Sequence, residues 1–274
     1  MTHTSSVESR GETILTAAVS LAQQRWRQRL LAAYALGSLA HGGFSAASDI
    51  DMGLVLDDPL LDTDSHGISE LAASIKATKQ PFADRLSVFW GSVASLSGAA
   101  QGGRFPPLDR LDLIKHGRLL CGVDVRNKLP PPSHEELVLA GAEFALWRLC
   151  TDEIIGKLKN PEALAQSDSK TLTKLILFPV RFMFTARTGE VGRNEAAVEH
   201  FVATVPGPLS RLAQLALEWR NAENWRADQD SIHAIADAIL PLYRSFVSDH
   251  EQRMRAYGRL DLAEAFQKWQ QRLH

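Results

Sequence analysis

Two aspartates separated by one residue give the clearest indication of chemistry in this sequence. Asp49 and Asp51 flank Ile50 at the start of an apolar run that ends at Leu56. Because side chains alternate between the two faces of a strand, we expect both carboxylates on one side, a few ångströms apart. Two like charges at that separation repel each other, and a divalent cation bound to both relieves the repulsion. We therefore predict a Mg²⁺ site, since this ion prefers carboxylate, water and phosphate oxygens.

A glycine-rich segment before the pair suits a phosphate group. Ser38 lies eleven residues before Asp49, and Gly37 ends a short apolar run over residues 32–36. Glycine lets a phosphate approach the backbone without a Cβ in the way, and N–H groups at the start of a helix favour an anion. The segment predicts a strand, a turn, a short helix and a second strand, with Gly37, Ser38 and Ser48 as nucleotide-binding residues.

The order of these motifs resembles the nucleotidyltransferase superfamily of DNA polymerase β, in which a helix-opening Gly-Ser is followed by an Asp-x-Asp strand. An Asp-x-Asp motif alone is also typical of a solvated turn, so the preceding Gly37-Ser38 is what favours a metal site. The resemblance implies that Asp49 and Asp51 are catalytic metal ligands. It also implies that Mg²⁺ is bound together with a nucleoside triphosphate such as ATP.

Two later segments resemble the streptomycin/spectinomycin adenylyltransferase branch of this superfamily. Residues 110–122 resemble the end of the catalytic domain in that branch. Residues 181–197 resemble its helical domain, with Arg181 followed by Thr-Gly-Glu and then Glu-Ala-Ala. Those enzymes carry a lysine between the last two elements, facing the nucleotide, and Arg193 or Asn194 stands there in this chain. Arginine keeps the charge but not the compact ammonium geometry, and the resemblance implies Arg193 as a phosphate ligand.

The resemblance also implies a third acid, which this sequence does not supply at the matching place. In the antibiotic adenylyltransferases a glutamate on the next strand joins the aspartate pair and takes the proton from the acceptor hydroxyl. The matching strand covers residues 86–90, where Ser87 stands in that position. Asp84 is the nearest acid and our candidate for the role, although a three-residue offset places it on the opposite face of a regular strand unless a bulge re-aims it. We therefore expect binding of Mg-nucleotide and slow transfer unless an acid from the helical domain completes the site.

Length and composition favour two domains. The chain has 274 residues, of which 45% are hydrophobic, which is enough for two sizeable cores. Three consecutive prolines cannot continue a helix and mark the boundary. We predict an α/β nucleotidyltransferase domain with a small mixed sheet over residues 1–127, a linker over 128–133 and an α-helical domain over 134–274.

The second domain is predicted to begin with a capped helix. Ser133 and Glu136 have the spacing of a capping box, and the helix is expected to reach about Cys150. The apolar side chains expected to face inward from this helix are Leu137, Ala140, Phe144 and Trp147.

Charge and cysteine content exclude several classes of protein. Lys plus Arg number 30 and Asp plus Glu number 32, so the net charge of −2 gives no sign of the basic face of a nucleic-acid binder. Cys121 and Cys150 lack the spacing of a zinc site or of a secreted disulfide scaffold. With no apolar run long enough to span a bilayer and no signal-peptide core, we expect a cytoplasmic protein, monomeric or homodimeric, without a membrane partner.

The sequence thus predicts a Mg²⁺-dependent nucleotidyltransferase that moves AMP, or another nucleoside monophosphate, from a triphosphate to a hydroxyl of a small molecule. An aminoglycoside-like antibiotic is one candidate acceptor, because Asp152 and Glu153 would suit a polycation. Two alternatives stay open: a regulatory or toxin–antitoxin-type nucleotide-binding protein with weak or no transfer, and an AMP transferase that modifies a protein. A serine hydrolase built on Ser45 is disfavoured, because a nucleophile elbow follows a strand and opens a helix.

Overall fold

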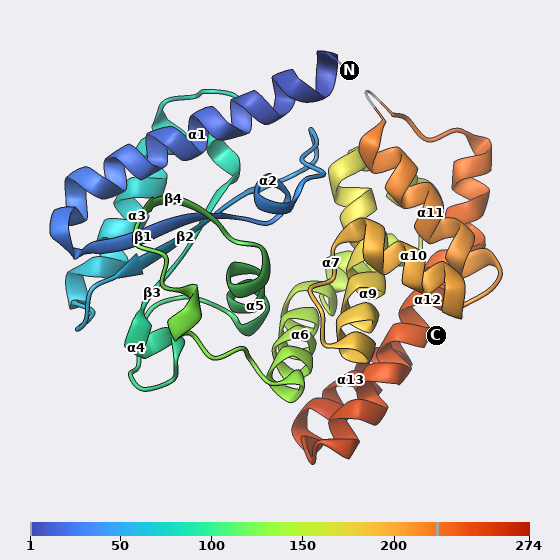
Figure 1. Cartoon of the computed structure of the whole chain (residues 1–274). Coiled ribbons are helices and arrows are strands. Elements are labelled where there is room, and N and C mark those ends of the chain that lie inside the picture. Colours follow the sequence, from blue (N-terminus) through green and yellow to red (C-terminus); the bar gives the residue numbers. More distant parts are fainter. Residues whose placement is uncertain (1, 223–224) are drawn as a thin grey trace. The chain divides into compact units, whose positions relative to one another are not determined.

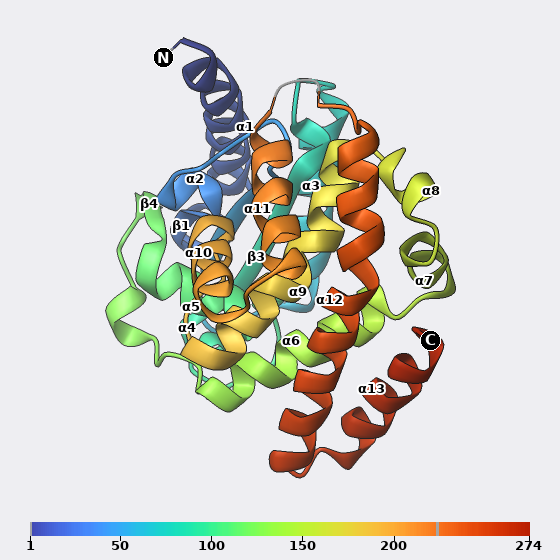
Figure 2. The same ribbon diagram turned by 90° about the vertical axis from the view of Figure 1, so that its right-hand side faces the viewer.

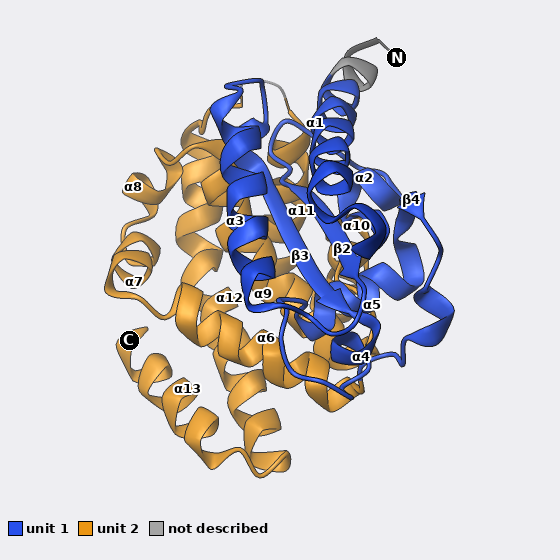
Figure 3. Ribbon diagram, turned by 90° about the vertical axis from the view of Figure 1, so that its left-hand side faces the viewer, with its two compact units in different colours: residues 1–132 blue, residues 133–274 orange. Residues whose placement is uncertain are grey.

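The structure, a computed structural model, describes residues 2–222 and 225–274. It comprises two compact units, one ending at Pro132 and the other beginning at Ser133 (Figure 3). The first is an α/β unit and the second is helical, which confirms the predicted fold class. None of the helices in the described residues combines the length and apolarity needed to cross a bilayer.

A four-stranded mixed sheet forms the centre of the first unit. Its strands are β1 (Leu30–Leu36), β2 (Ile50–Leu56), β3 (Leu86–Ser92) and β4 (Arg118–Gly122), in the order β3-β2-β1-β4. Strand β2 runs parallel to β3, whereas β1 is antiparallel to both β2 and β4. The β2–β3 crossover needs a helix, because parallel neighbours cannot be joined by a tight turn.

Helices cover both faces of this sheet (Figure 1). The helical elements of this unit are α1 (Thr2–Trp26), η1 (Arg27–Arg29), α2 (Ser38–His41), α3 (Asp62–Ala77), η2 (Ala83–Arg85), α4 (Val93–Leu96), α5 (Pro107–His116) and η3 (Arg126–Lys128). Met52 and Leu54 of β2 pack with α1 and α3 on one face, while Val55 packs with Leu113 of α5 on the other. By alternation, position 51 belongs to the face that α5 covers.

One buried carboxylate joins the first helix to the start of α3. Asp64 is 2% exposed and accepts hydrogen bonds from Trp26 Nε1 at 2.9 Å, from Leu61 N at 2.8 Å and from two guanidinium nitrogens of Arg29, each at 2.9 Å. Burial opposes ionisation, but these donors outweigh it and lower the pKa of Asp64. The carboxylate is therefore a structural anchor, since its donors are left unpaired if it is removed.

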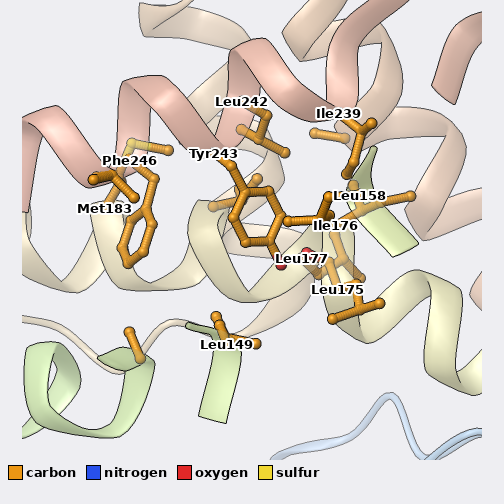
Figure 4. Close-up of a cluster of buried hydrophobic side chains, with 14 of the residues drawn as sticks. Leu149, Leu158, Leu175, Ile176, Leu177, Met183, Ile239, Leu242, Tyr243 and Phe246 are labelled. Atoms are coloured by element: carbon orange, nitrogen blue, oxygen red, sulfur yellow. Dashed lines mark hydrogen bonds between the residues drawn. The ribbon is translucent and has the colours of Figure 1, made fainter. Parts of the chain in front are cut away.

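The second unit consists of helices packed around a single core. They are α6 (His134–Leu149), α7 (Asp152–Leu158), α8 (Pro161–Ala165), α9 (Ser169–Thr188), α10 (Asn194–Thr204), α11 (Pro208–Asn221), α12 (Gln229–Ala256) and α13 (Leu260–Arg272). Helices α9, α11 and α12 lie side by side (Figure 2). Tyr243 of α12 lies among Ile176, Leu177 and Leu242, and its hydroxyl donates to the Leu175 carbonyl at 2.9 Å (Figure 4).

The start of α6 confirms one prediction, and its middle shows another to be wrong. The capping box is present, with Ser133 Oγ accepting from Glu136 N at 3.1 Å and Glu136 Oε2 accepting from Ser133 N at 2.7 Å. Phe144 and Trp147 do not face inward, because they are 40% and 73% exposed. Leu137 is buried as predicted, and the helix also buries Val138, Ala142, Ala145 and Leu149.

Candidate active site

The turn between β1 and α2 has a conformation that requires glycine. Gly37 has φ 59° and ψ −146°, in a region that residues with a Cβ rarely adopt. A Cβ at this position would lie 2.8 Å from Asp51 Oδ2, closer than van der Waals contact allows. The Gly37 carbonyl accepts from Ala40 N at 3.0 Å and from His41 N at 3.2 Å, which closes the single turn of α2. The missing side chain therefore brings the Asp51 carboxylate against the backbone that precedes Ser38.

The two predicted metal ligands are held by β2 and by the residue just before it. Asp51 is the second residue of β2 and pairs with Leu36 of β1 and with Ser87 of β3. Asp49 comes two positions earlier, directly before the first strand residue, and both aspartates are half-buried. Among the residues described, no group of three or more His, Cys, Asp and Glu side chains is arranged to hold a metal ion. Asp49 and Asp51 therefore stay predicted metal ligands at the start of β2.

Ser48 belongs to the loop that leads to Asp49. Its hydroxyl accepts from Ser45 N at 3.0 Å, Ser48 N donates to the Ser45 carbonyl at 3.0 Å, and the residue is 3% exposed. Arg85 of η2 donates to the Ala46 carbonyl, and its Nη1 lies 3.4 Å from the Ser48 carbonyl. These bonds fix the path of the loop into Asp49 without any ligand, so nucleotide contact by Ser48 stays a prediction.

Ser87, rather than Asp84, neighbours the aspartate pair. In the parallel register Ser87 stands beside Asp51, and side chains of paired residues project from the same face of a sheet. Asp84 lies in the 3-10 turn η2 before the strand and is exposed. A regular strand geometry therefore does not apply to Asp84, because the strand begins two residues later. Its catalytic role stays a prediction without a contact to the pair.

Sequence reasoning missed an acid that contacts the glycine turn. Asp112 of α5 is 6% exposed, and its Oδ2 accepts from Gly37 N at 2.7 Å. Its Oδ1 lies 4.0 Å from Nε2 of His41. The signal that could have found it is a lone carboxylate between Leu111 and Leu113, both of which are buried. An acid at a core position of an amphipathic helix needs a specific partner.

Arg193 lies in the second unit, at a turn with several anchors. Helix α9 ends at Gly189, which has φ 71°, and Arg193 is the residue before α10. Arg181 Nε donates to the Gly192 carbonyl, and Thr185 Oγ1 donates to the Glu190 carbonyl at 2.9 Å. The Arg181, Thr-Gly-Glu and Glu-Ala-Ala elements of the sequence therefore form one structured turn. Arg193 itself is half-buried, and phosphate contact by it stays a prediction.

A separate hollow of about 490 Å³ in the first unit is lined by Ile114, Asp124, Arg126 and Asn127. None of the predicted site residues lines it. Arg126 pairs with Asp124 at 2.6 Å, and this guanidinium lowers the pKa of that carboxyl. The charges of the hollow satisfy each other, so its geometry does not indicate a ligand.

Comparison with known proteins gives a likeness in structure only. The sequence matches no protein-family model and no curated protein sequence. Among solved structures, the fold is similar to that of the spectinomycin adenyltransferase AAD(9) from Enterococcus faecialis, crystallised with ATP and spectinomycin. The TM-score is 0.59 at 14% sequence identity, over 83% of this chain and 98% of that chain. At this identity the likeness establishes the nucleotidyltransferase-like fold.

Proposed function

We propose that this protein is a nucleotidyltransferase that binds a Mg-nucleoside triphosphate through Asp49, Asp51 and the Gly37–Ser38 turn. It would transfer the nucleoside monophosphate to a hydroxyl of a small molecule. The observation that carries the proposal is the packing of Asp51 against Gly37, where a Cβ would lie 2.8 Å from the carboxylate. It occurs in a fold shared with an adenyltransferase whose structure contains ATP.

The residues present fit a magnesium ion. The pair offers hard carboxylate oxygens from Asp51 in β2 and from Asp49 directly before it. Because Gly37 has no Cβ, the Asp51 carboxylate lies close to the turn that precedes Ser38. Asp49 and Asp51 would hold the ion, which when bound neutralises phosphate charge as a Lewis acid. The protein would leave further coordination positions to water and phosphate oxygens, as is usual for Mg²⁺.

In the transfer step the acceptor hydroxyl oxygen forms a bond to the α-phosphorus while the bond to the pyrophosphate oxygen breaks. Pyrophosphate leaves with the bonding electron pair, and the hydroxyl proton goes to a base. Ser38, at the first position of α2, would orient the departing phosphates, and Arg193 would add positive charge to them. The Ser87 hydroxyl beside Asp51 cannot take the proton at neutral pH. Solvent or the carboxylate of another residue must therefore act as the base.

The acids that would suit a polycationic acceptor lie in the first turn of α7. Asp152 and Glu153, considered above for a polycationic acceptor, are already paired, with Arg272 and with Lys157 respectively. These exposed pairs are weak and could be exchanged for a ligand ammonium. An aminoglycoside-like acceptor is therefore compatible with the helical unit but is not selected by it.

A nucleotide-binding protein with weak or no transfer is the second candidate, and Ser87 is the observation that favours it. Both candidates require Mg-nucleotide binding, and only the first requires pyrophosphate release that depends on an acceptor. Binding is tested by calorimetry with Mg-α,β-methylene-ATP, which resists transfer. We expect Asp49→Asn and Asp51→Asn each to abolish binding. Asp57→Asn, one residue beyond the other end of β2, is the matched control and should bind as the parent does.

If the parent binds no nucleoside triphosphate, both candidates are wrong. If Asp49→Asn and Asp51→Asn bind as well as the parent, the metal assignment is wrong. Binding together with acceptor-dependent release of pyrophosphate supports the transferase, and binding without release for any acceptor in a broad panel supports the second candidate.

A further inference from the structure

The Asp112 carboxylate is buried and only half satisfied. Its Oδ2 accepts from Gly37 N at 2.7 Å, but its Oδ1 has no hydrogen-bond partner. The residue is 6% exposed, so water does not readily compensate. An unpaired oxygen on a buried carboxylate costs free energy and calls for a specific reason.

The His41 side chain lies close to that oxygen. Its Nε2 lies 4.0 Å from Asp112 Oδ1, so a small rotation of the imidazole closes the gap to a hydrogen bond. The His41 and His116 rings form a T-shaped pair, with ring centroids 5.7 Å apart and an interplanar angle of 75°. Both histidines and Asp112 thus form one cluster under the α2 turn.

The cluster joins both ends of a very short helix. Helix α2 has four residues, too few to be stable alone, since a helix gains stability only by propagating beyond its first turn. Asp112 holds the amide of Gly37, the residue before α2, and lies beside His41, its last residue. One carboxylate therefore lies beside the residues at both ends of the turn that contains Ser38.

We propose that Asp112 is a positioning residue of the nucleotide site, acting through Gly37 and His41 to hold Ser38 for the triphosphate. This inference rests on the proposed function, because Ser38 has a ligand only if a nucleotide binds. The rival explanation is that Asp112 merely stabilises the α/β unit, as Asp64 does. A positioning role predicts that loss of Asp112 weakens nucleotide binding in the folded protein. A purely structural role predicts lower stability with unchanged affinity.

The experiment measures the Kd of Mg-α,β-methylene-ATP and of adenosine for the parent and for variants at Asp112, Asp64 and His41. Asp112→Ala removes the carboxylate, and Asp112→Asn keeps an oxygen that can accept from Gly37 N. Asp64→Asn is the control for loss of a buried charge in the same unit. All affinities are measured below the unfolding range of the least stable variant.

We expect Asp112→Ala to weaken binding of the triphosphate analogue at least about tenfold, the equivalent of one hydrogen bond, and Asp112→Asn to weaken it less. Adenosine binding should change by less than about twofold, because only the phosphates contact the turn. Asp64→Asn should lower thermal stability and leave both affinities unchanged. If Asp112 acts partly through His41, the two effects are coupled. The Asp112→Ala/His41→Ala double variant should then weaken binding of the triphosphate analogue by less than the product of the two single fold-changes in Kd.

An unchanged triphosphate affinity in Asp112→Ala, or an equal loss in Asp64→Asn, overturns the inference. Hydrogen–deuterium exchange over residues 37–41 separates its failure from failure of the proposed function. If the parent binds no triphosphate, the proposed function fails and the nucleotide role of Asp112 fails with it. Faster exchange in Asp112→Ala but not in Asp64→Asn would then still establish that Asp112 orders the turn, and unchanged exchange would refute that as well.

Discussion

Replacing Gly37 with alanine should damage both folding and nucleotide binding, for two separable reasons. The backbone at Gly37 has φ 59° and ψ −146°, and a residue with a Cβ in such a region costs about 1–3 kcal/mol. The new Cβ would also lie 2.8 Å from Asp51 Oδ2 and must displace that carboxylate. Overpacking of this kind costs about 1–3 kcal/mol more.

Gly42→Ala is the matched control. Gly42 has φ 90° and ψ 169°, but a Cβ there meets nothing within 4 Å. Gly42→Ala should therefore lower the free energy of unfolding by about 1–3 kcal/mol through backbone strain alone, without any contact with Asp51. Urea unfolding followed by circular dichroism gives both free energies of unfolding, and thermal unfolding with and without Mg-ATP shows whether each variant still binds.

We expect Gly37→Ala to be less stable than Gly42→Ala by about 1–3 kcal/mol and to lose the Mg-ATP stabilisation, which Gly42→Ala should keep. Equal stabilities of the two variants, each with the stabilisation of the parent, would refute the claim that Gly37 is required by its contact with Asp51.

Three further predictions concern other parts of the chain. Ser87→Glu should raise the rate of transfer to a fixed acceptor by about 10²-fold or more, because it restores a base beside Asp51, whereas Asp84→Ala should change the rate little; the opposite pattern would place the third acid at Asp84. Burial raises the pKa of Tyr34 to about 12, so its contribution to stability is complete below its ordinary pKa of 10.0 and is lost as the pH rises through about 12. Tyr34→Phe should remove that alkaline loss in urea unfolding measured across this range, and a loss that persists in the variant would contradict the assignment. Arg193→Ala should weaken triphosphate binding more than adenosine binding in calorimetry, and equal changes would exclude a phosphate contact.

Local signals explain why much of the fold could be predicted from the sequence. The boundaries of β2 follow from an apolar run between aspartates, and the capping box at the start of α6 depends on two side chains three residues apart. The mixed sheet followed by helices was implied by the family resemblance together with the proline-rich boundary. For β2 and for the capping box, the residues that determine the feature lie within a few positions of one another.

Features that depend on distant partners could not be predicted in this way. Asp112 contacts Gly37 across 75 positions of sequence, and no local pattern links them. Phe144 and Trp147 of α6 were wrongly assigned to the buried side because apolar residues occur around much of this helix. Periodicity therefore does not select the stripe that contains Ala142 and Ala145 over the one that contains Phe144 and Trp147. The packing partner, rather than hydrophobicity, decides which stripe is buried.

Transfer of a labelled nucleotide tests the central claim most directly. The parent protein and Asp51→Asn are each incubated with α-labelled ATP, or another α-labelled triphosphate, together with Mg²⁺ and a panel of hydroxyl-bearing small molecules that includes aminoglycosides and aminocyclitols. We predict that label passes from the triphosphate to an acceptor with release of one pyrophosphate per transfer, that chelation of Mg²⁺ stops it, and that Asp51→Asn shows none. A labelled acceptor formed equally well by Asp51→Asn, or triphosphate that remains intact with every acceptor, would contradict the account.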